Sequence, residues 1–135
     1  CVLNGSIMFM GELLKRLNFP LRIVSTKLTS YYGMDSCGEV SQSLGFTGVI
    51  EGARCIVVED IVDTGKSIAK MKQLLSKASA REIYYCTLCF KPGKYQAAEK
   101  IDYCGIEIPD DFVVGFGLDY DELGRNLPDI YTLDI

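Results

Sequence analysis

The sequence predicts an α/β fold in which a mainly parallel, twisted sheet is flanked by helices. Apolar runs rich in β-branched residues recur along the chain, and amphipathic segments with helical spacing lie between several of them. At 135 residues the chain has the size of one domain and should bury roughly two-thirds of its unfolded surface. We expect a single domain over residues 1–135, with ligands bound at the carboxyl ends of the strands.

The N-terminal part predicts a strand, a turn and a helix. Residues 1–3 have the character of the end of a buried strand, residues 4–6 of a tight turn, and residues 7–17 of an amphipathic helix. Asn18 and Pro20 stop this helix, because proline cannot continue one. The chain starts inside an apolar run without a methionine, so we expect an N-terminal part of the fold to be missing from it.

The next stretch predicts a strand, a loop and a strand pair. Residues 22–28 are rich in β-branched side chains, which favour a strand. Residues 29–39 are polar and contain glycine, so we expect a mobile lid loop, with a merely disordered connection as the alternative. Residues 41–51 predict a short strand pair that turns at Gly45 or Gly48.

The second half predicts strands around one strong helix. Residues 54–58 form a continuous apolar run, typical of a strand buried on both faces, and residues 83–90 and 112–116 predict two further strands. A helix is expected from Ser67 onward, because apolar residues recur there at spacings of three and four, at Ile68, Met71, Leu75 and Ala78.

Composition excludes several classes of function. The net charge of -4 argues against a nucleic-acid partner, and no apolar run approaches the ~18 residues of a membrane span. Histidine is absent, so catalysis must rely on carboxylates, lysine, arginine or a metal held by oxygen. Among the six cysteines, Cys86 and Cys89 should point to opposite faces of a strand, and others lie in apolar segments. We expect a soluble, reduced, cytoplasmic protein.

The most informative stretch runs from Val57 to Ser67, where an apolar strand ends in acids and passes through a small-residue turn into a helix. Backbone N–H groups at a helix start, with nearby hydroxyls, form a cradle for a phosphate. Glu59 and Asp60 would repel that phosphate unless a cation or a neutral donor lay between them, and ribose hydroxyls supply such donors. A nucleotide-binding P-loop is less well matched, because it requires glycine where Asp60 stands.

The string Glu-Asp-Ile-Val-Asp-Thr-Gly-Lys-Ser resembles the signature with which type I phosphoribosyltransferases bind phosphoribosyl pyrophosphate (PRPP). Three further segments match the hypoxanthine-guanine branch of that family in order, so the resemblance covers nearly the whole chain. It implies the type I phosphoribosyltransferase fold and a purine-salvage enzyme that uses Mg²⁺ and transfers the phosphoribosyl group of PRPP to a 6-oxopurine. It also implies a homodimer or homotetramer.

The resemblance also assigns roles to residues. Ribose phosphate binding falls to Glu59, Asp60, Asp63, Thr64, Gly65, Lys66 and Ser67, and metal contacts to Glu59, Asp60 and Asp119. Asn4 and Gly5, in a loop that often contains a non-proline cis peptide, and Arg125 would contact pyrophosphate. Ser30 and Tyr31 resemble the start of the closing loop, and Lys91, Phe112, Val113 and Asp119 the purine site. Asn4 stands where the family often has a basic residue, so this loop would bind through backbone N–H groups alone.

Four of these residues also have simpler interpretations. Asp63, expected to act as the general base, could instead only cap the following helix. Lys91 could be an exposed lysine at a strand end, Phe112 a core residue and Asp119 part of a solvated turn. The structure can separate these alternatives, because burial and contacts differ between them.

Two other functions compete with the enzyme. A non-catalytic protein with the same fold could regulate by binding nucleotide and RNA or protein, although the acidic charge and the presence of Asp63 and Lys91 argue against it. A phosphate-transfer receiver would explain Glu59 and Asp60 at a strand end, but not the hydroxyl-rich turn that follows them.

Overall fold

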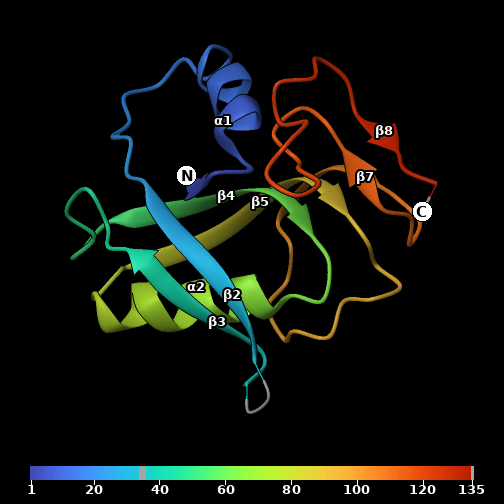
Figure 1. The fold of residues 1–135 in the computed structure, drawn as a ribbon. Coiled ribbons are helices and arrows are strands. Elements are labelled where there is room, and N and C mark those ends of the chain that lie inside the picture. Colours follow the sequence, from blue (N-terminus) through green and yellow to red (C-terminus); the bar gives the residue numbers. More distant parts are fainter. Residues whose placement is uncertain (34–35, 135) are drawn as a thin grey trace.

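The structure, a computed structural model, describes residues 1–33 and 36–134, without the side chains of residues 31–37. Two helices and eight strands lie in these described residues (Figure 1). In chain order they are β1 (Val2–Leu3), α1 (Ile7–Leu14), β2 (Thr26–Gly33), β3 (Ser36–Leu44), β4 (Arg54–Val62), α2 (Lys66–Lys77), β5 (Glu82–Phe90), β6 (Tyr103–Glu107), β7 (Val113–Val114) and β8 (Tyr131–Thr132).

A parallel sheet of strand order β4-β5-β6 forms the centre of the molecule. Helix α2 is the crossover that joins β4 to β5, as a parallel pair requires. Helices α1 and α2 lie on opposite sides of β4 and β5, so helices flank this sheet as the sequence predicts (Figure 1). The prediction of strands at 54–58 and 83–90 and of a helix beginning near Ser67 is confirmed.

A second sheet has the order β1-β2-β3, in which β1 runs parallel to β2 and β3 runs antiparallel to it. A mobile lid loop was expected over residues 29–39, and in the described part of that range the chain forms a hairpin of β2 and β3. Ser30 lies exposed in β2, the side chain of Tyr31 is not described, and residues 34–35 fall outside the described part. The predicted strand pair over residues 41–51 is wrong, since Ser41 pairs with β2.

The remaining strands are short or lack a buried face. The strand predicted over residues 112–116 is reduced to β7, which pairs antiparallel with β8. Gly115 and Phe116 have φ angles of 106° and 51°, which end the extended conformation. The sequence did not predict β6, because every residue of that strand is exposed and it has no apolar periodicity.

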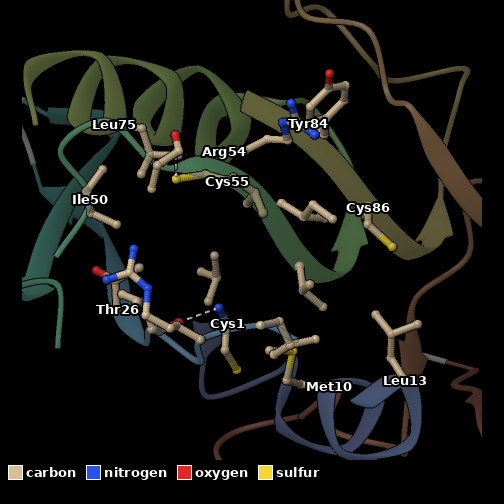
Figure 2. Close-up of a pocket in the computed structure, with 18 of the residues that line it drawn as sticks. Cys1, Met10, Leu13, Thr26, Ile50, Arg54, Cys55, Leu75, Tyr84 and Cys86 are labelled. Carbon is tan, nitrogen blue, oxygen red and sulfur yellow. Dashed lines mark hydrogen bonds between the residues drawn. The ribbon is translucent and has the colours of Figure 1, made fainter. Parts of the chain in front are cut away.

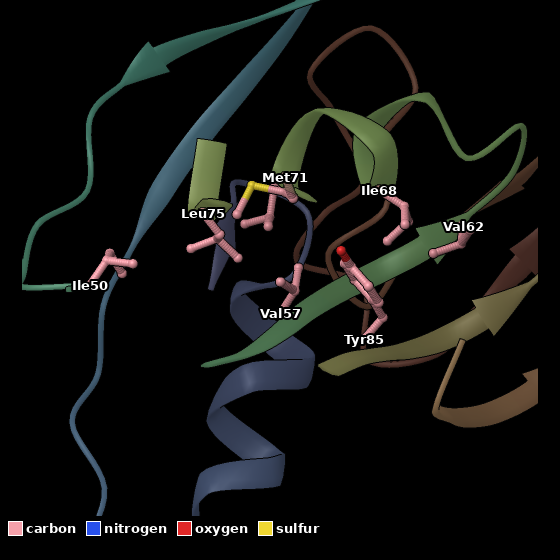
Figure 3. Close-up of a cluster of buried hydrophobic side chains, with 8 residues drawn as sticks. Ile50, Val57, Val62, Ile68, Met71, Leu75 and Tyr85 are labelled. Carbon is pink, nitrogen blue, oxygen red and sulfur yellow. The ribbon is translucent and has the colours of Figure 1, made fainter. Parts of the chain in front are cut away.

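The hydrophobic core lies between α2 and the central sheet (Figure 3). Ile68, on the first turn of α2, is 1% exposed, and Val62, at the end of β4, is also 1% exposed. Their burial anchors the start of the helix to the end of the strand. The core as a whole consists of Val2, Ile50, Val57, Val62, Ile68, Met71, Leu75 and Tyr85.

Two further sequence expectations concern cysteines and membranes. Burial alternates along β5, so Cys89 is fully buried while Cys86 lies on the other face, as predicted. The described cysteines are free thiols. Neither α1 nor α2, the helices of the described residues, is long and apolar enough to cross a membrane.

We expect Ile68→Ala to lower the free energy of unfolding by about 2–5 kcal/mol, because it removes buried methyl groups and leaves a cavity. Ile106→Ala is the matched control, since Ile106 is 53% exposed, and it should cost less than about 1 kcal/mol. Urea unfolding followed by circular dichroism measures both. Equal losses in the two variants would contradict the position of the core.

Candidate functional site

The turn from Thr64 to Ser67, between β4 and α2, has a geometry suited to an anion, and we call it the phosphate turn. Gly65 precedes the helix with a φ of 89°, a left-handed conformation that favours glycine. A Cβ at Gly65 would lie 2.6 Å from a ring carbon of Tyr95 and 2.7 Å from the Cβ of Ala97, so a larger residue does not fit. Within the described part of the chain, no side-chain hydrogen bond caps the N-terminus of α2. A helix start of this kind is suited to bind a phosphate, and the interpretation of Asp63 as a helix cap is wrong.

Glu59 lies beneath this turn. Its side chain is 4% exposed and forms a hydrogen bond with the hydroxyl of Ser67, in the first turn of α2. Among the described residues, Oε1 of Glu59 has no hydrogen-bond partner. Burial, followed by the nearby charge of Asp60, raises the pKa of Glu59 well above its ordinary value. The structure thus joins the first acid of the motif to the phosphate turn.

Asp60 faces the loop that follows β1, since neighbouring residues of a strand point to opposite faces. A Cβ at Gly5 would collide with the Asp60 carboxylate, so glycine is needed for this close approach. Burial raises the pKa of Asp60, and the charges of Arg125 and Asp119 act on it in opposite directions. The two acids of the motif therefore serve two adjoining subsites.

The second of these subsites gathers residues that are far apart in the sequence. The peptide bond between Leu3 and Asn4 is cis, as the family resemblance predicted. Arg125 donates from Nη1 to the carbonyl oxygen of Gly117 at 2.7 Å, and its Nη2 lies 3.2 Å from Oδ1 of Asp119. A Cβ at Gly117 would meet the carbonyl oxygen of Gly5, which brings this cluster against the loop after β1.

Asp119 is part of a turn and part of this cluster. Its Oδ2 accepts a hydrogen bond from the backbone N–H of Glu122 at 2.9 Å, while its Oδ1 faces Arg125. The turn interpretation and the site interpretation of Asp119 are thus compatible.

Lys91 and Asp63 meet at the other end of the phosphate turn. Lys91 is 6% exposed, so the interpretation as an exposed strand-end lysine is wrong. Its Nζ lies 3.6 Å from Oδ2 of Asp63, and its backbone N–H donates to the carbonyl oxygen of Val62. Oδ1 of Asp63 has no hydrogen-bond partner among the described residues. One carboxylate oxygen thus faces a cation, while the other is buried with its acceptor capacity unused among the described residues.

Phe112 presents an aromatic face near the start of β7. The ring is 41% exposed, so the core interpretation is wrong. Tyr120 packs edge-on against it, with ring centroids 5.8 Å apart and an interplanar angle of 87°. Val113 follows in β7 and is half-buried. An exposed ring held by a perpendicular neighbour is suited to stacking on a flat heterocycle.

An apolar cavity of about 890 Å³ lies elsewhere, between α1 and β4 (Figure 2). Its walls include Met10 and Leu13 of α1, Cys55 of β4 and Cys86 of β5. None of the predicted site residues lines it. The polar turn, and not this cavity, is therefore the candidate site.

Comparison with known proteins agrees with this geometry. A family model described as the phosphoribosyl transferase domain matches residues 1–121. The chain belongs to this family. A hypoxanthine-guanine phosphoribosyltransferase of Staphylococcus epidermidis is 41% identical to this phosphoribosyltransferase over 133 residues, which are 98% of this chain and 74% of the relative.

Solved structures extend the comparison. The crystal structure of a hypoxanthine phosphoribosyltransferase from Staphylococcus aureus is similar with a TM-score of 0.90 at 40% identity, over 98% of this chain and 73% of that one. A hypoxanthine-guanine phosphoribosyltransferase from Bacillus anthracis gives a TM-score of 0.90 at 32% identity, over 98% and 79% of the two chains. The predicted type I phosphoribosyltransferase fold is thus confirmed.

The carboxylates of this phosphoribosyltransferase fit a magnesium ion that is shared with a substrate. Within residues 1–33 and 36–134, no three His, Cys, Asp or Glu side chains gather to hold a metal by themselves. Magnesium usually binds one or two carboxylates together with substrate phosphates. The charge of Asp119 acts on Asp60 and raises its pKa, so these two carboxylates are the candidates for such a shared ion.

The segment of residues 91–99, which lies behind the phosphate turn of this phosphoribosyltransferase, was not predicted from the sequence. Nζ of Lys94 lies 3.8 Å from Asp63 and 3.3 Å from Asp110, so a second lysine faces the expected base. Tyr95 and Ala97 pack against Gly65. The only sequence signal for this segment is its position after a strand end, which does not reveal what it packs against.

Glu59→Gln should stabilise the protein at neutral pH, since it removes a buried carboxylate while an amide oxygen can still accept from Ser67. The pKa of Glu59 is higher in the folded protein than in the unfolded chain, so the folded protein keeps the carboxyl proton to a higher pH. The free energy of unfolding of the natural protein therefore falls as pH rises above about 4.5, the ordinary pKa of this group. The stabilisation by Glu59→Gln should therefore grow as pH rises above about 4.5 and vanish below that pH.

Thermal unfolding in EDTA, from pH 4 upward, measures this difference. Glu51→Gln is the control, because Glu51 is exposed, and it should show no such trend. A gain for Glu59→Gln that does not depend on pH would argue that Glu59 is not a buried acid.

Proposed function

We propose that this chain is a hypoxanthine-guanine phosphoribosyltransferase of purine salvage, which converts PRPP and hypoxanthine or guanine into IMP or GMP and pyrophosphate. One observation carries the proposal: the buried Lys91 is held 3.6 Å from Asp63 beside the phosphate turn. This supports the proposal, because a lysine suited to recognise a base would then lie beside a turn suited to bind a ribose phosphate. The relatives that bear this name support it.

In the proposed reaction, a ring nitrogen of the purine forms a bond to C1 of the ribose as the bond from C1 to pyrophosphate breaks. The turn from Thr64 to Ser67 binds the 5-phosphate, and Glu59 and Asp60 bind the ribose hydroxyls. Asp63 accepts the proton that the purine loses from its other nitrogen.

Pyrophosphate leaves on the side of the site where Arg125 and Asp119 lie near Gly5. Arg125 supplies donors to the departing oxygens, and the backbone N–H groups of Asn4 and Gly5 supply others. Asp60 and Asp119 would hold Mg²⁺, which offsets the negative charge of the leaving group when it is bound.

Lys91 determines the choice of base. Its ammonium donates a hydrogen bond to the 6-oxo group of hypoxanthine or guanine, while a 6-amino group offers only another donor. A hydrogen bond to a charged group contributes about 1.5–3 kcal/mol, or roughly 10- to 150-fold. Phe112 stacks on the purine, and Val113 packs beside it.

Three wider features belong to the proposal. The hairpin of β2 and β3 is the lid, with Ser30 and Tyr31 in its first strand, and its closure would exclude water from the reactive sugar. The protein acts in the cytoplasm, in keeping with its free thiols. It assembles as a homodimer or homotetramer.

Purified protein with PRPP and magnesium should release pyrophosphate with hypoxanthine or guanine and not with adenine. Lys91→Met should raise the KM for the oxopurine by about 10- to 150-fold, because it removes the charged donor. Lys100→Met is the control, as Lys100 is exposed on the same connection. PRPP binding without turnover on any oxopurine would instead favour a non-catalytic regulator.

Asp63→Asn should keep the affinity for PRPP while lowering kcat by at least about tenfold, since the amide cannot accept the purine proton. Single-turnover kinetics and calorimetric titration with PRPP separate the two effects. Asp129→Asn, at an exposed position, should leave both unchanged. Full turnover in Asp63→Asn would remove this residue from the role of base.

A further inference from the structure

A connecting segment, residues 91–99, crosses behind the phosphate turn, and we call it the brace. Its first residue, Lys91, donates from its backbone N–H to the carbonyl oxygen of Val62 at 3.0 Å. Gln96 donates in the same way to Thr64 at 2.9 Å. These two hydrogen bonds lie on either side of Asp63 in the sequence, so the brace fixes the backbone both before and after the expected base.

Tyr95 is the side chain of the brace that contacts the turn. Its ring carbons occupy the space into which a side chain at Gly65 would project. The ring also packs edge-on against Phe90, the last residue of β5, with centroids 5.2 Å apart and an interplanar angle of 78°. Its hydroxyl donates to the carbonyl oxygen of Glu99 at 2.5 Å. The ring is thus held on several sides while it supports Gly65.

The far end of the brace is attached to the helix that follows the turn. Oε1 of Glu99 lies 3.0 Å from Nζ of Lys72 in α2, and the side chain of Glu99 is only 11% exposed. The brace therefore contacts the end of β5, the turn and α2. A displacement of Tyr95 would move Gly65 relative to the helix, and with it the N–H groups that the turn presents.

We propose that Tyr95 is a positioning residue of the phosphate turn: by filling the space behind Gly65, its ring sets the affinity for PRPP without touching that substrate. This inference rests on the proposed function, because it assumes that the turn binds the 5-phosphate. Small displacements of binding groups have large effects on affinity and rate. The ring, more than its hydroxyl, makes the contact with Gly65.

The test compares Tyr95→Ala with Tyr95→Phe, which keeps the ring. Tyr95→Ala should weaken PRPP binding and raise the KM for PRPP by about tenfold, with kcat changed by less than about twofold. Tyr95→Phe should retain nearly the natural affinity. Calorimetric titration with PRPP and magnesium measures the affinity, and initial rates give the KM for PRPP and kcat.

Two further variants make the result decisive. Tyr103→Ala is the matched control, because Tyr103 is 55% exposed on β6, and it should leave the KM for PRPP unchanged. Ala97→Val probes the same contact independently, since the Cβ of Ala97 also lies against Gly65. The added methyl groups should weaken PRPP binding even where Tyr95→Ala fails to fold.

The outcomes are distinguishable from failure of the proposed function. If the natural protein binds no PRPP, the proposed function is wrong. If the natural protein binds and transfers normally while Tyr95→Ala and Ala97→Val bind PRPP equally well, the positioning role is wrong. A fall in kcat with no change in the KM for PRPP would likewise overturn it, because the phosphate turn would then bind PRPP as well without the ring as with it.

Discussion

The structure depends on one junction, where β4 ends and α2 begins. Val62 and Ile68 are both 1% exposed, so burial fixes the last residue of the strand and the first turn of the helix. Between them, Gly65 adopts a left-handed conformation, which L-residues with a side chain rarely adopt. The chain is thereby forced to turn sharply and to present the helix N-terminus at the carboxyl edge of the sheet, where ligands of such folds bind.

The charges around this junction explain how an acidic chain can bind anions. The net charge is -4, and burial raises the pKa values of both Glu59 and Asp60. Cationic groups, Lys91 beside Asp63 and Arg125 beside Asp119, stand at the two ends of the site. Under the proposed function, local geometry determines ligand binding here, while the overall field of the protein opposes it.

Sequence predicts the parts of this arrangement that are encoded locally. The strand from Arg54 and the helix after Gly65 carry apolar patterns, and the turn between them contains glycine. These signals lie in contiguous residues, and all three elements are confirmed. The β2–β3 hairpin was missed, because its polar strands carry no alternating apolar pattern. The brace was missed because Tyr95 contacts Gly65, 30 positions away in the chain, and no local pattern encodes such a contact.

Nuclear magnetic resonance of the ¹⁵N-labelled protein, titrated with ribose 5-phosphate, tests the anion-binding turn most directly. Hydrogen bonds from N–H groups to a phosphate shift their amide resonances, and the largest changes should fall on residues Thr64 to Ser67. Saturation of those shifts at one phosphate per chain would support the account. Unmoved resonances in that turn, with changes concentrated elsewhere, would contradict it.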